Sequence, residues 1–335
     1  MSTESTRVTV MGAGSWGTAF SLVLCDAGQQ VTLWARRPEL ADKINTQQCN
    51  PDYFPTIDLP ETLRADHDPD RAMAGAEYVV LAVPAQSLRA TMAQWRIPAD
   101  ATVISLAKGI ELGTGYRMSQ VITEVAGIPE ERIGVVTGPN LAREIAERQP
   151  SASVVASASQ DLAVRLQQLC HTSRFRAYTN NDVIGCELAG ATKNVIALAV
   201  GMAAGLGFGA NATASVITRG LAETARLGHA LGADPYTFSG LAGLGDLVAT
   251  CSSPLSRNRT FGEELGWGRT VAEITGETRQ VAEGVKSCSS IQDLARRHGV
   301  EMPIVDQVAA VIAGTITAKE MIVALMSRSA KPERY

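Results

Sequence analysis

The first half of the chain alternates short apolar runs with stretches that place apolar residues at helical spacing. Several runs are apolar at every position, which is typical of parallel strands covered on both faces. The predicted strands are residues 8–11, 31–34, 78–83, 102–106, 133–137 and 153–156, and helices are predicted between them, including 17–27, 38–45 and 86–92. This alternation predicts a doubly wound α/β domain.

The second half has a different pattern, because strand-like runs disappear after about residue 180. Helical spacing predicts helices at residues 182–206, 212–231, 270–274, 289–298, 302–312 and 318–327, and Gly228, Gly232 and Gly299 stand where helices could end. We therefore expect two domains, an α/β domain over residues 1–180 and an all-α domain over residues 181–335. The helical domain is expected to supply the substrate site.

One apolar segment, residues 195–209, invites comparison with a membrane helix. It is shorter than the ~20 residues that a membrane helix needs. It is rich in Ala and Gly, and the charged Glu187 and Lys193 precede it. A buried central helix is the prediction, without membrane insertion.

A glycine-rich turn follows the first predicted strand. Gly12, Gly14 and Gly17 form G-x-G-x-x-G between this strand and a helix, and a second strand follows in order. In a dinucleotide-binding turn the first glycine permits the tight bend, the second lets the backbone approach a pyrophosphate, and the third lets helix and strand pack closely. The order predicts a Rossmann-type domain that binds a dinucleotide at a helix N-terminus. An ordinary strand-to-helix turn is the alternative.

Two arginines end the second predicted strand, where an NAD site usually has Asp or Glu. Guanidinium groups suit a ribose 2′-phosphate because they form charge-assisted, bidentate bonds. Arg36 and Arg37 therefore predict a preference for NADP over NAD. The alternatives are that one or both arginines are solvated, or that an arginine stacks on adenine without selecting for the phosphate.

Lys193 is the first candidate for chemistry in the second half. On a helix its neighbours are Ala189, Gly190, Ile196 and Ala197, and three of these four are small, which leaves room beside the amine. Burial and a nearby cation would both lower the pKa of the amine and make it a usable proton donor and acceptor. The alternative is a lysine that extends to solvent from a helix edge.

Residues 240–262 supply a second group of candidates. Asp246 is a single carboxylate among small residues, and the run Ser256-Arg257-Asn258-Arg259 offers hydroxyl, guanidinium and amide donors in succession. Such donors suit a phosphate monoester. The alternative is a polar loop between helices with its charges in water.

A series of short motifs together resembles the bacterial-type NAD(P)-dependent glycerol-3-phosphate dehydrogenases. The motifs are Gly-Ala-Gly-Ser-Trp-Gly at 12–17, Ala-Val-Pro-Ala-Gln at 82–86, Ala-Lys-Gly-Ile-Glu at 107–111, Thr-Gly-Pro-Asn-Leu-Ala at 137–142, Ala-Thr-Lys-Asn-Val at 191–195, Gly-Leu-Gly-Asp-Leu at 243–247, Ser-Arg-Asn-Arg at 256–259 and Val-Ala-Glu-Gly-Val at 281–285. The resemblance implies that dihydroxyacetone phosphate and NAD(P)H give sn-glycerol 3-phosphate, reversibly, for glycerophospholipid synthesis. It also implies a homodimer.

The resemblance further implies a role for each matching residue. Lys193, Lys108 and Asp246 would be catalytic, with Lys193 as the proton donor and acceptor. The substrate would be bound by these three together with Gly138, Asn140, Ser256, Arg257 and Asn258. The cofactor would be bound by Gly12, Gly14, Ser15, Trp16, Gly17, Arg36, Arg37, Lys108, Ala142, Arg257, Val281 and Glu283. One departure is that Asn140 and Leu141 replace the Ser and Phe of the family's usual Gly-Pro-Ser-Phe-Ala, so we expect altered detail at position 140.

Composition bounds the remaining possibilities. The chain has 335 residues and a formal net charge of −4, so no global basic field attracts nucleic acid or an anionic membrane. Six scattered cysteines without a C-x-x-C pair favour core packing in a reducing compartment, and the N-terminus lacks the apolar region of a secretory signal, so the cytoplasm is expected. The four histidines show no metal-ligand spacing, and no metal is expected.

Two other functions compete with the dehydrogenase. A related two-domain dehydrogenase, of the 6-phosphogluconate or ketopantoate type, would act on another hydroxy acid or sugar phosphate; the 240–262 segment argues against it. A dinucleotide-sensing regulator without catalysis would need a face that binds DNA or a partner, and the chain shows no basic stripe.

Overall fold

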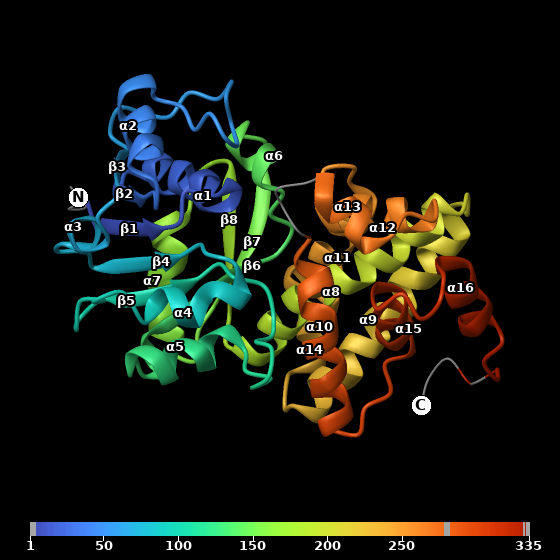
Figure 1. Ribbon diagram of the computed structural model, residues 1–335. Coiled ribbons are helices and arrows are strands. Elements are labelled where there is room, and N and C mark those ends of the chain that lie inside the picture. Colours follow the sequence, from blue (N-terminus) through green and yellow to red (C-terminus); the bar gives the residue numbers. More distant parts are fainter. Residues whose placement is uncertain (1–4, 278–281, 331, 333–335) are drawn as a thin grey trace.

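The computed structural model describes residues 5–277, 282–330 and 332. It has two parts, a sheet flanked by helices and a cluster of helices that lies beside α6 and the strands β6 and β7 (Figure 1). The predicted fold class, a Rossmann-type sheet followed by a helical domain, is confirmed. Among the described residues after Asn180, no strand is present.

The sheet has eight strands in the order β3-β2-β1-β4-β5-β6-β7-β8. The strands are β1 (Arg7–Met11), β2 (Gln30–Trp34), β3 (Arg64–Asp66), β4 (Tyr78–Leu81), β5 (Thr102–Ser105), β6 (Ile133–Thr137), β7 (Ser151–Ala156) and β8 (Phe175–Asn180). The strands from β3 to β6 pair in parallel, β7 runs antiparallel to β6, and β8 is parallel to β7. The order reverses between β1 and β4, which is where doubly wound sheets bind ligands.

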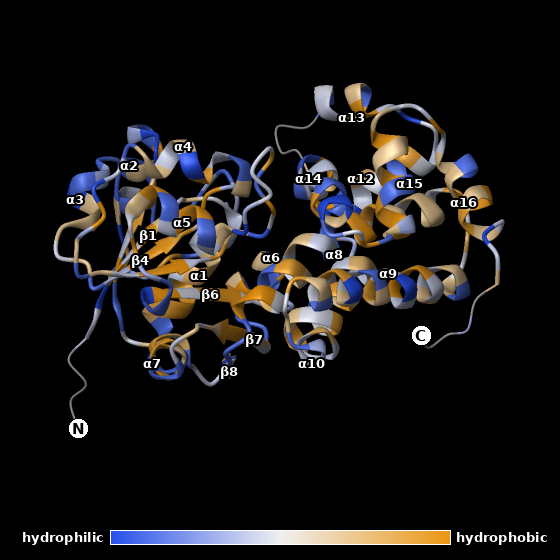
Figure 2. Cartoon of the chain, turned by 90° about the horizontal axis from the view of Figure 1, so that it is seen from below, coloured by the Kyte–Doolittle hydropathy of each residue, from blue (hydrophilic) through white to orange (hydrophobic). Residues whose placement is uncertain are grey.

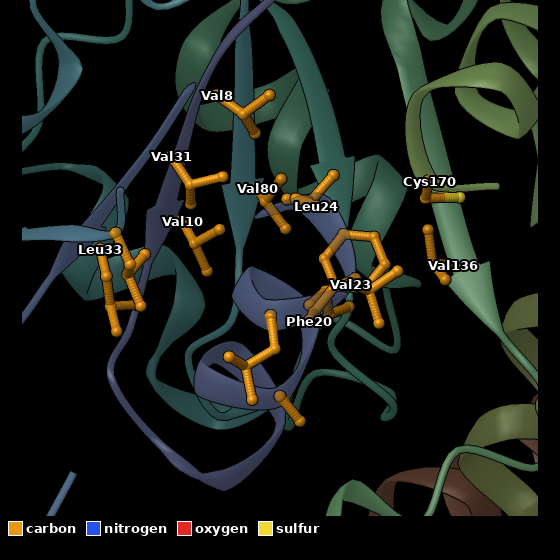
Figure 3. Packing of buried hydrophobic residues seen from close by; sticks show 14 of the residues in the cluster. Val8, Val10, Phe20, Val23, Leu24, Val31, Leu33, Val80, Val136 and Cys170 are labelled. Atoms are coloured by element: carbon orange, nitrogen blue, oxygen red, sulfur yellow. The ribbon is translucent and has the colours of Figure 1, made fainter. Parts of the chain in front are cut away.

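Helices cover both faces of this sheet. They are α1 (Ser15–Asp26), α2 (Pro38–Gln47), α3 (Pro69–Met73), α4 (Leu88–Met92), α5 (Met118–Ala126), α6 (Ala142–Ala146) and α7 (Gln160–Cys170). Alternate strand residues pack against opposite layers. Val10 and Val80 lie against Phe20 of α1 (Figure 3), whereas Val79 belongs to the core under α4 and α5. Figure 2 shows the resulting apolar strands β1, β4 and β6 inside a polar outer layer.

The second part consists of α8 (Val183–Gly205), α9 (Ala210–Ala230), α10 (Pro235–Ser239), a π-helical turn (Leu241–Gly245), α11 (Asp246–Ser252), α12 (Arg257–Gly266), α13 (Val271–Glu277), α14 (Glu283–Arg297), α15 (Pro303–Ile312) and α16 (Ala318–Met326). The predicted helices are present, although α14 begins six residues earlier than expected. The prediction that Gly228 ends a helix was wrong, because this residue lies inside α9. Packing explains the glycine instead, since a Cβ there would meet the Phe238 ring at 2.1 Å. Gly232 and Gly299, with φ of 85° and 66°, do follow helix ends.

α8 is the central helix of the second part. It begins twelve residues before the apolar segment 195–209, and with 23 residues the whole helix is long and apolar enough to cross a membrane. However, 89% of the 18-residue apolar stretch within this helix is buried in the protein, which confirms the predicted buried central helix. The cysteines are free thiols, and Cys170, Cys186, Cys251 and Cys288 are buried as small core residues.

Helices α8 and α12 meet backbone to backbone. A Cβ on Gly201 or Gly205 of α8 would lie 2.0 and 2.2 Å from the carbonyl oxygens of residues 259 and 263. In return, a Cβ on Gly262 or Gly266 of α12 would lie 2.2 and 2.5 Å from the carbonyl oxygens of residues 198 and 202. Each helix thus carries two glycines four residues apart, which face its neighbour. Only glycine permits this approach.

Candidate active site

The glycine-rich turn has the geometry that a dinucleotide site needs. Gly12 has φ of 137°, and a Cβ there would lie 2.7 Å from the carbonyl oxygen of Ala82. A Cβ on Gly17 would lie 1.9 Å from the Gly12 carbonyl oxygen, so close packing excludes any side chain. Gly14 faces open space and begins α1 without a side-chain cap. The free backbone N–H groups of this helix end therefore fit an anion such as a pyrophosphate.

Two buried polar atoms without a hydrogen-bond partner also fit a bound dinucleotide. The indole Nε1 of Trp16 and Oε2 of Glu283 are buried and have no hydrogen-bond partner among the described residues. Buried polar atoms are normally bonded, so unpartnered ones near a proposed site are where ligand atoms fit. Burial raises the pKa of Glu283, and the charges of Lys286 and Arg257 oppose that rise. Val281, also predicted to bind the cofactor, lies outside the described residues.

The two arginines after β2 are in different environments. Both are exposed, and Arg37 forms an ion pair with Asp52. For Arg36 no ion pair occurs within residues 5–277 and 282–330. Arg36 is therefore the better placed of the two to pair with a ribose phosphate.

Two lysines from different domains share one carboxylate. Lys108, in the loop after β5, donates to Oδ2 of Asp246 at 2.5 Å, and Lys193 of α8 donates to Oδ1 of the same side chain. Asp246 begins α11 and is 1% exposed, and Lys193 is 9% exposed. The cluster carries a formal charge of +1 when both amines are protonated, so it has a positive field for an oxyanion.

Backbone and hydroxyl groups complete the cluster. Lys108 also donates to the carbonyl oxygen of Gly138 at 3.1 Å, and Lys193 also donates to Oγ1 of Thr250 at 2.9 Å. Thr250 lies one helical turn after Asp246 and donates to its Oδ1 at 3.3 Å. Sequence reasoning did not predict Thr250, although its four-residue spacing from Asp246 placed it on the same helix face.

The pKa of Lys193 is lowered to about 8, chiefly because the amine is buried. The charge of Asp246 opposes this lowering, and the positive charge of Lys108 adds to it. The predicted lowering by burial and a second cation agrees with this environment. An amine with such a pKa can both donate and accept a proton near neutral pH.

The small residues around Lys193 were expected to leave room beside the amine, but at Gly190 other protein side chains take up this space. A Cβ on Gly190 would lie 3.2 Å from Oγ1 of Thr137 and 3.4 Å from Cγ of Lys108. The absence of a side chain thus lets the Lys108 chain lie against α8. Oγ1 of Thr137 is buried and has no partner among the described residues.

The predicted phosphate-binding residues lie at the N-terminus of α12. Ser256 is the N-cap residue and accepts from the Arg259 N–H at 3.3 Å, and Arg257 is exposed in the first turn. Asn258 donates to Oδ1 of Asn194 at 2.9 Å and accepts from the Gly284 N–H at 2.8 Å. This segment is a helix start and not an open loop, so the backbone N–H groups add to the side-chain donors.

The segment after β6 lies beside Lys108. Gly138 has φ of 122°, which favours glycine, and its carbonyl accepts from Lys108. Asn140 donates to Oγ of Ser153 at 3.0 Å, and its Oδ1 is buried without a partner among the described residues. Ala142 is the first residue of α6 and is half-buried.

Two family models match the chain. NAD-dependent glycerol-3-phosphate dehydrogenase N-terminus matches residues 7–163, and the C-terminus of the same family matches residues 182–323. The chain belongs to this family. The predicted family, enzyme class and NAD(P) cofactor are thereby confirmed.

Relatives named glycerol-3-phosphate dehydrogenase [NAD(P)+] match nearly the whole chain. That of Thermobifida fusca is 61% identical and covers 98% of this chain and 99% of its own. That of Streptomyces griseus subsp. griseus is 59% identical, with 99% of each chain covered. The crystal structure of the glycerol-3-phosphate dehydrogenase from Coxiella burnetii has a TM-score of 0.92 at 35% identity, covering 97% of this chain and 99% of its own. Family membership favours the dehydrogenase over a ketopantoate- or 6-phosphogluconate-type enzyme and over a regulator.

This family member also has a hollow of about 440 Å³, away from the candidate catalytic residues. It is at the start of α8, between Arg117 and Asp234, and none of the predicted site residues lines it. Arg117 and Ser119 bond there to the buried Glu187 of α8. The candidate catalytic groups are therefore not in this hollow, but in the tight contact where Lys108 meets α8 and α11.

Proposed function

We propose that the protein catalyses reversible hydride transfer between NAD(P)H and dihydroxyacetone phosphate, giving sn-glycerol 3-phosphate for glycerophospholipid synthesis. The observation that carries this proposal is the buried group of Lys108, Lys193 and Asp246. A ketone that becomes an alkoxide needs a proton and a positive field, and this group offers both. Family membership supports the substrate.

Lys193 is proposed as the proton donor to the substrate oxygen during ketone reduction and as the acceptor in the reverse direction. Lys108 would stabilise the developing negative charge and contact substrate and cofactor. Asp246 would orient both amines, because each of its carboxylate oxygens accepts from one of them. Gly138 and Asn140 would line the substrate site beside Lys108.

The start of α12 is proposed to hold the substrate phosphate. Ser256, Arg257 and Asn258 would contribute, with the helix N-terminus adding backbone donors. The amide of Asn258 bonds to Asn194, which follows Lys193 directly, so the proposed phosphate site is connected to the lysine helix. Binding at a distance from the reacting carbon would fix the substrate's orientation.

The dinucleotide is proposed to lie across the glycine-rich turn. When bound, it supplies or accepts the hydride. The residues proposed to hold it are Gly12, Gly14, Ser15, Trp16, Gly17, Arg36, Arg37, Lys108, Ala142, Arg257, Val281 and Glu283. NADP is the proposed preference, because Arg36 has no competing ion pair within the described residues.

Replacement of Arg36 by alanine should reduce the preference for NADPH. Loss of a charge-assisted bond is expected to lower the ratio of kcat/KM for NADPH to that for NADH by about 10–100-fold. Arg71→Ala is the matched control, because Arg71 is an exposed arginine of the same domain that pairs with Asp66 and is not among the proposed cofactor residues. Initial rates at varied cofactor concentration measure the ratio, and an unchanged ratio in Arg36→Ala would contradict the assignment.

The pH dependence should differ between the two directions of reaction. Ketone reduction needs protonated Lys193, so kcat/KM for dihydroxyacetone phosphate should be level below about pH 8 and fall above it. Oxidation of glycerol 3-phosphate needs the neutral amine, so its kcat/KM should rise with pH and level off above about 8. Initial rates from pH 6 to 10 test this. Parallel profiles in both directions would contradict a single titrating donor.

The first test of the function is oxidation of NADPH and of NADH by the purified protein with dihydroxyacetone phosphate, followed by absorbance. Rapid oxidation that depends on this substrate supports the proposal. A protein that binds NADPH but does not oxidise it with dihydroxyacetone phosphate, yet does so with ketopantoate, would overturn it.

Further properties are proposed on family membership and sequence. We propose a homodimer, a cytoplasmic location without membrane insertion, no nucleic-acid partner, and a domain boundary near residue 180. Analytical ultracentrifugation of the full chain tests the dimer, and a mass equal to one chain of 35.4 kDa at micromolar concentration would exclude it.

A further inference from the structure

A buried asparagine outside all the motifs contacts the middle of the glycine-rich turn. Asn50 follows α2 and is 0% exposed. Its Nδ2 donates to the carbonyl oxygen of Ala13 at 3.0 Å and to Oγ1 of Thr18 at 2.9 Å. Ala13 is the residue between Gly12 and Gly14.

The partners fix the orientation of this amide. The Ala13 carbonyl can only accept, and the Asp52 N–H, which lies 3.3 Å from Oδ1 of Asn50, can only donate. The Asn50 backbone is also fixed, because its carbonyl accepts from the N–H groups of Tyr53 and Phe54. The side chain is therefore held on both sides.

A bond to the Ala13 carbonyl determines where the Gly14 N–H points. Both groups belong to one planar trans peptide unit, so they point in opposite directions. With the carbonyl held inward by Asn50, the N–H of Gly14 points outward, and among the described residues it has no acceptor. A Cβ built on Gly14 would meet no atom within 4 Å, so the residue is not enclosed by packing.

The turn needs such a bond because Ala13 has a glycine on each side. Glycine visits more backbone conformations than any other residue, so this peptide unit would otherwise rotate at small cost. We propose that Asn50 is a positioning residue for the dinucleotide, which aims the Gly14 N–H at the pyrophosphate. The inference rests on the proposed dinucleotide site.

The chain offers a matched control for Asn50. Asn45 also bridges two backbone groups, because its Nδ2 donates to the Ala65 carbonyl at 2.8 Å and its Oδ1 accepts from the Ala65 N–H at 2.8 Å. It joins α2 to β3, and both of these hydrogen bonds are to the backbone of Ala65, not to the turn. Asn45→Ala therefore removes a similar bridge in the same domain.

The experiment is calorimetric titration of the purified variants without substrate. In Asn50→Ala the Kd for NADPH and for ADP-ribose is expected to rise about tenfold, as loss of one buried hydrogen bond implies. The Kd for 2′-AMP, which lacks a pyrophosphate, should stay within about twofold. Asn50→Asp keeps the shape but cannot donate when ionised, so it should lose at least as much affinity for NADPH.

Kinetics give a second readout. The KM for NADPH should rise with the Kd in Asn50→Ala, while kcat at saturating NADPH and the KM for dihydroxyacetone phosphate stay unchanged. Thr18→Val, which removes only the second acceptor, should bind NADPH normally. Asn50→Ser, which retains a smaller donor, provides a third variant if Asn50→Ala does not fold.

Three results would overturn the inference. The first is unchanged NADPH affinity in a folded Asn50→Ala or Asn50→Asp. The second is an equal loss of affinity for 2′-AMP, and the third is an equal loss in Asn45→Ala, since either would show a general effect on the domain. Failure of the unaltered protein to bind NADPH would instead overturn the proposed dinucleotide site.

Discussion

Lys193→Ala should lower kcat/KM for dihydroxyacetone phosphate by about 10²–10⁴-fold, the usual contribution of a positioned proton donor. The protein should remain folded, because Lys108 and Asp246 still form a neutral pair when Lys193 is gone. The variant should also bind NADPH normally, since Lys193 lies in the helical domain and outside the glycine-rich turn. Initial rates and calorimetric titration with NADPH measure both effects.

Two controls separate proton transfer from a loss of packing. Added primary amines should partly restore the activity of Lys193→Ala, because a small amine can occupy the vacated space and donate a proton. Lys319→Ala, at an exposed lysine of α16, should leave kcat/KM unchanged. Residual activity of Lys193→Ala within about tenfold of the unaltered protein would reject Lys193 as the principal donor.

Asp246→Asn should affect stability as well as activity. Asp246 is 1% exposed and is the shared carboxylate partner of two lysines, so its loss leaves two largely buried amines without a counter-charge. Breaking a buried ion pair on one side costs about 3–5 kcal/mol of the free energy of unfolding. The kcat for ketone reduction should also fall, because the pKa of Lys193 drops further when the opposing effect of Asp246 is removed. Urea denaturation at pH 7 measures the stability.

The pH dependence of this loss has a definite sign. A lysine whose pKa is lowered by folding opposes folding at every pH below its ordinary pKa of 10.5, and most strongly below its pKa in the folded protein. The loss in free energy of unfolding caused by Asp246→Asn should therefore become smaller as the pH rises from 7 towards 10.5. Asp293→Asn, at an exposed aspartate of α14, should cost less than about 1 kcal/mol at any pH. A deficit for Asp246→Asn that is no larger than this control would contradict the role of the carboxylate.

The sequence predicted the parts of the fold that depend on local pattern. β4 is a continuous apolar run and β1 is buried from Val8 to Met11, because both faces of these strands are covered. The glycine-rich turn is recognisable because Gly12 and Gly17 meet two separate steric demands at fixed spacing. The edge strands β3 and β8 lacked such a signal. β3 has only three residues, and β8 alternates buried and exposed positions at its start. Their strand character comes from pairing with neighbours.

The candidate site was predictable as a set of residues but not as an arrangement. The sequence named Lys108, Lys193 and Asp246 as separate candidates. Their shared contact arises only on folding, because Asp246 lies 138 positions after Lys108 and 53 positions after Lys193. Asn50 gave no local signal, because its function depends on a carbonyl 37 residues away. Ser256 and Asn258 appeared as free donors, but folding engages both with protein partners.

The glycine contact between α8 and α12 sets a fixed length in the proposed site. Side chains at a helix interface can change rotamer and let the helices shift, but two backbones in contact have no such freedom. In the proposed site, the distance from Lys193 to the start of α12 would then set the separation between the carbonyl and the phosphate of a bound substrate. A ketose phosphate with one more carbon between these groups would reach the phosphate site only with its carbonyl away from the lysine. Chain-length selectivity would then be a property of four glycines that never contact the substrate.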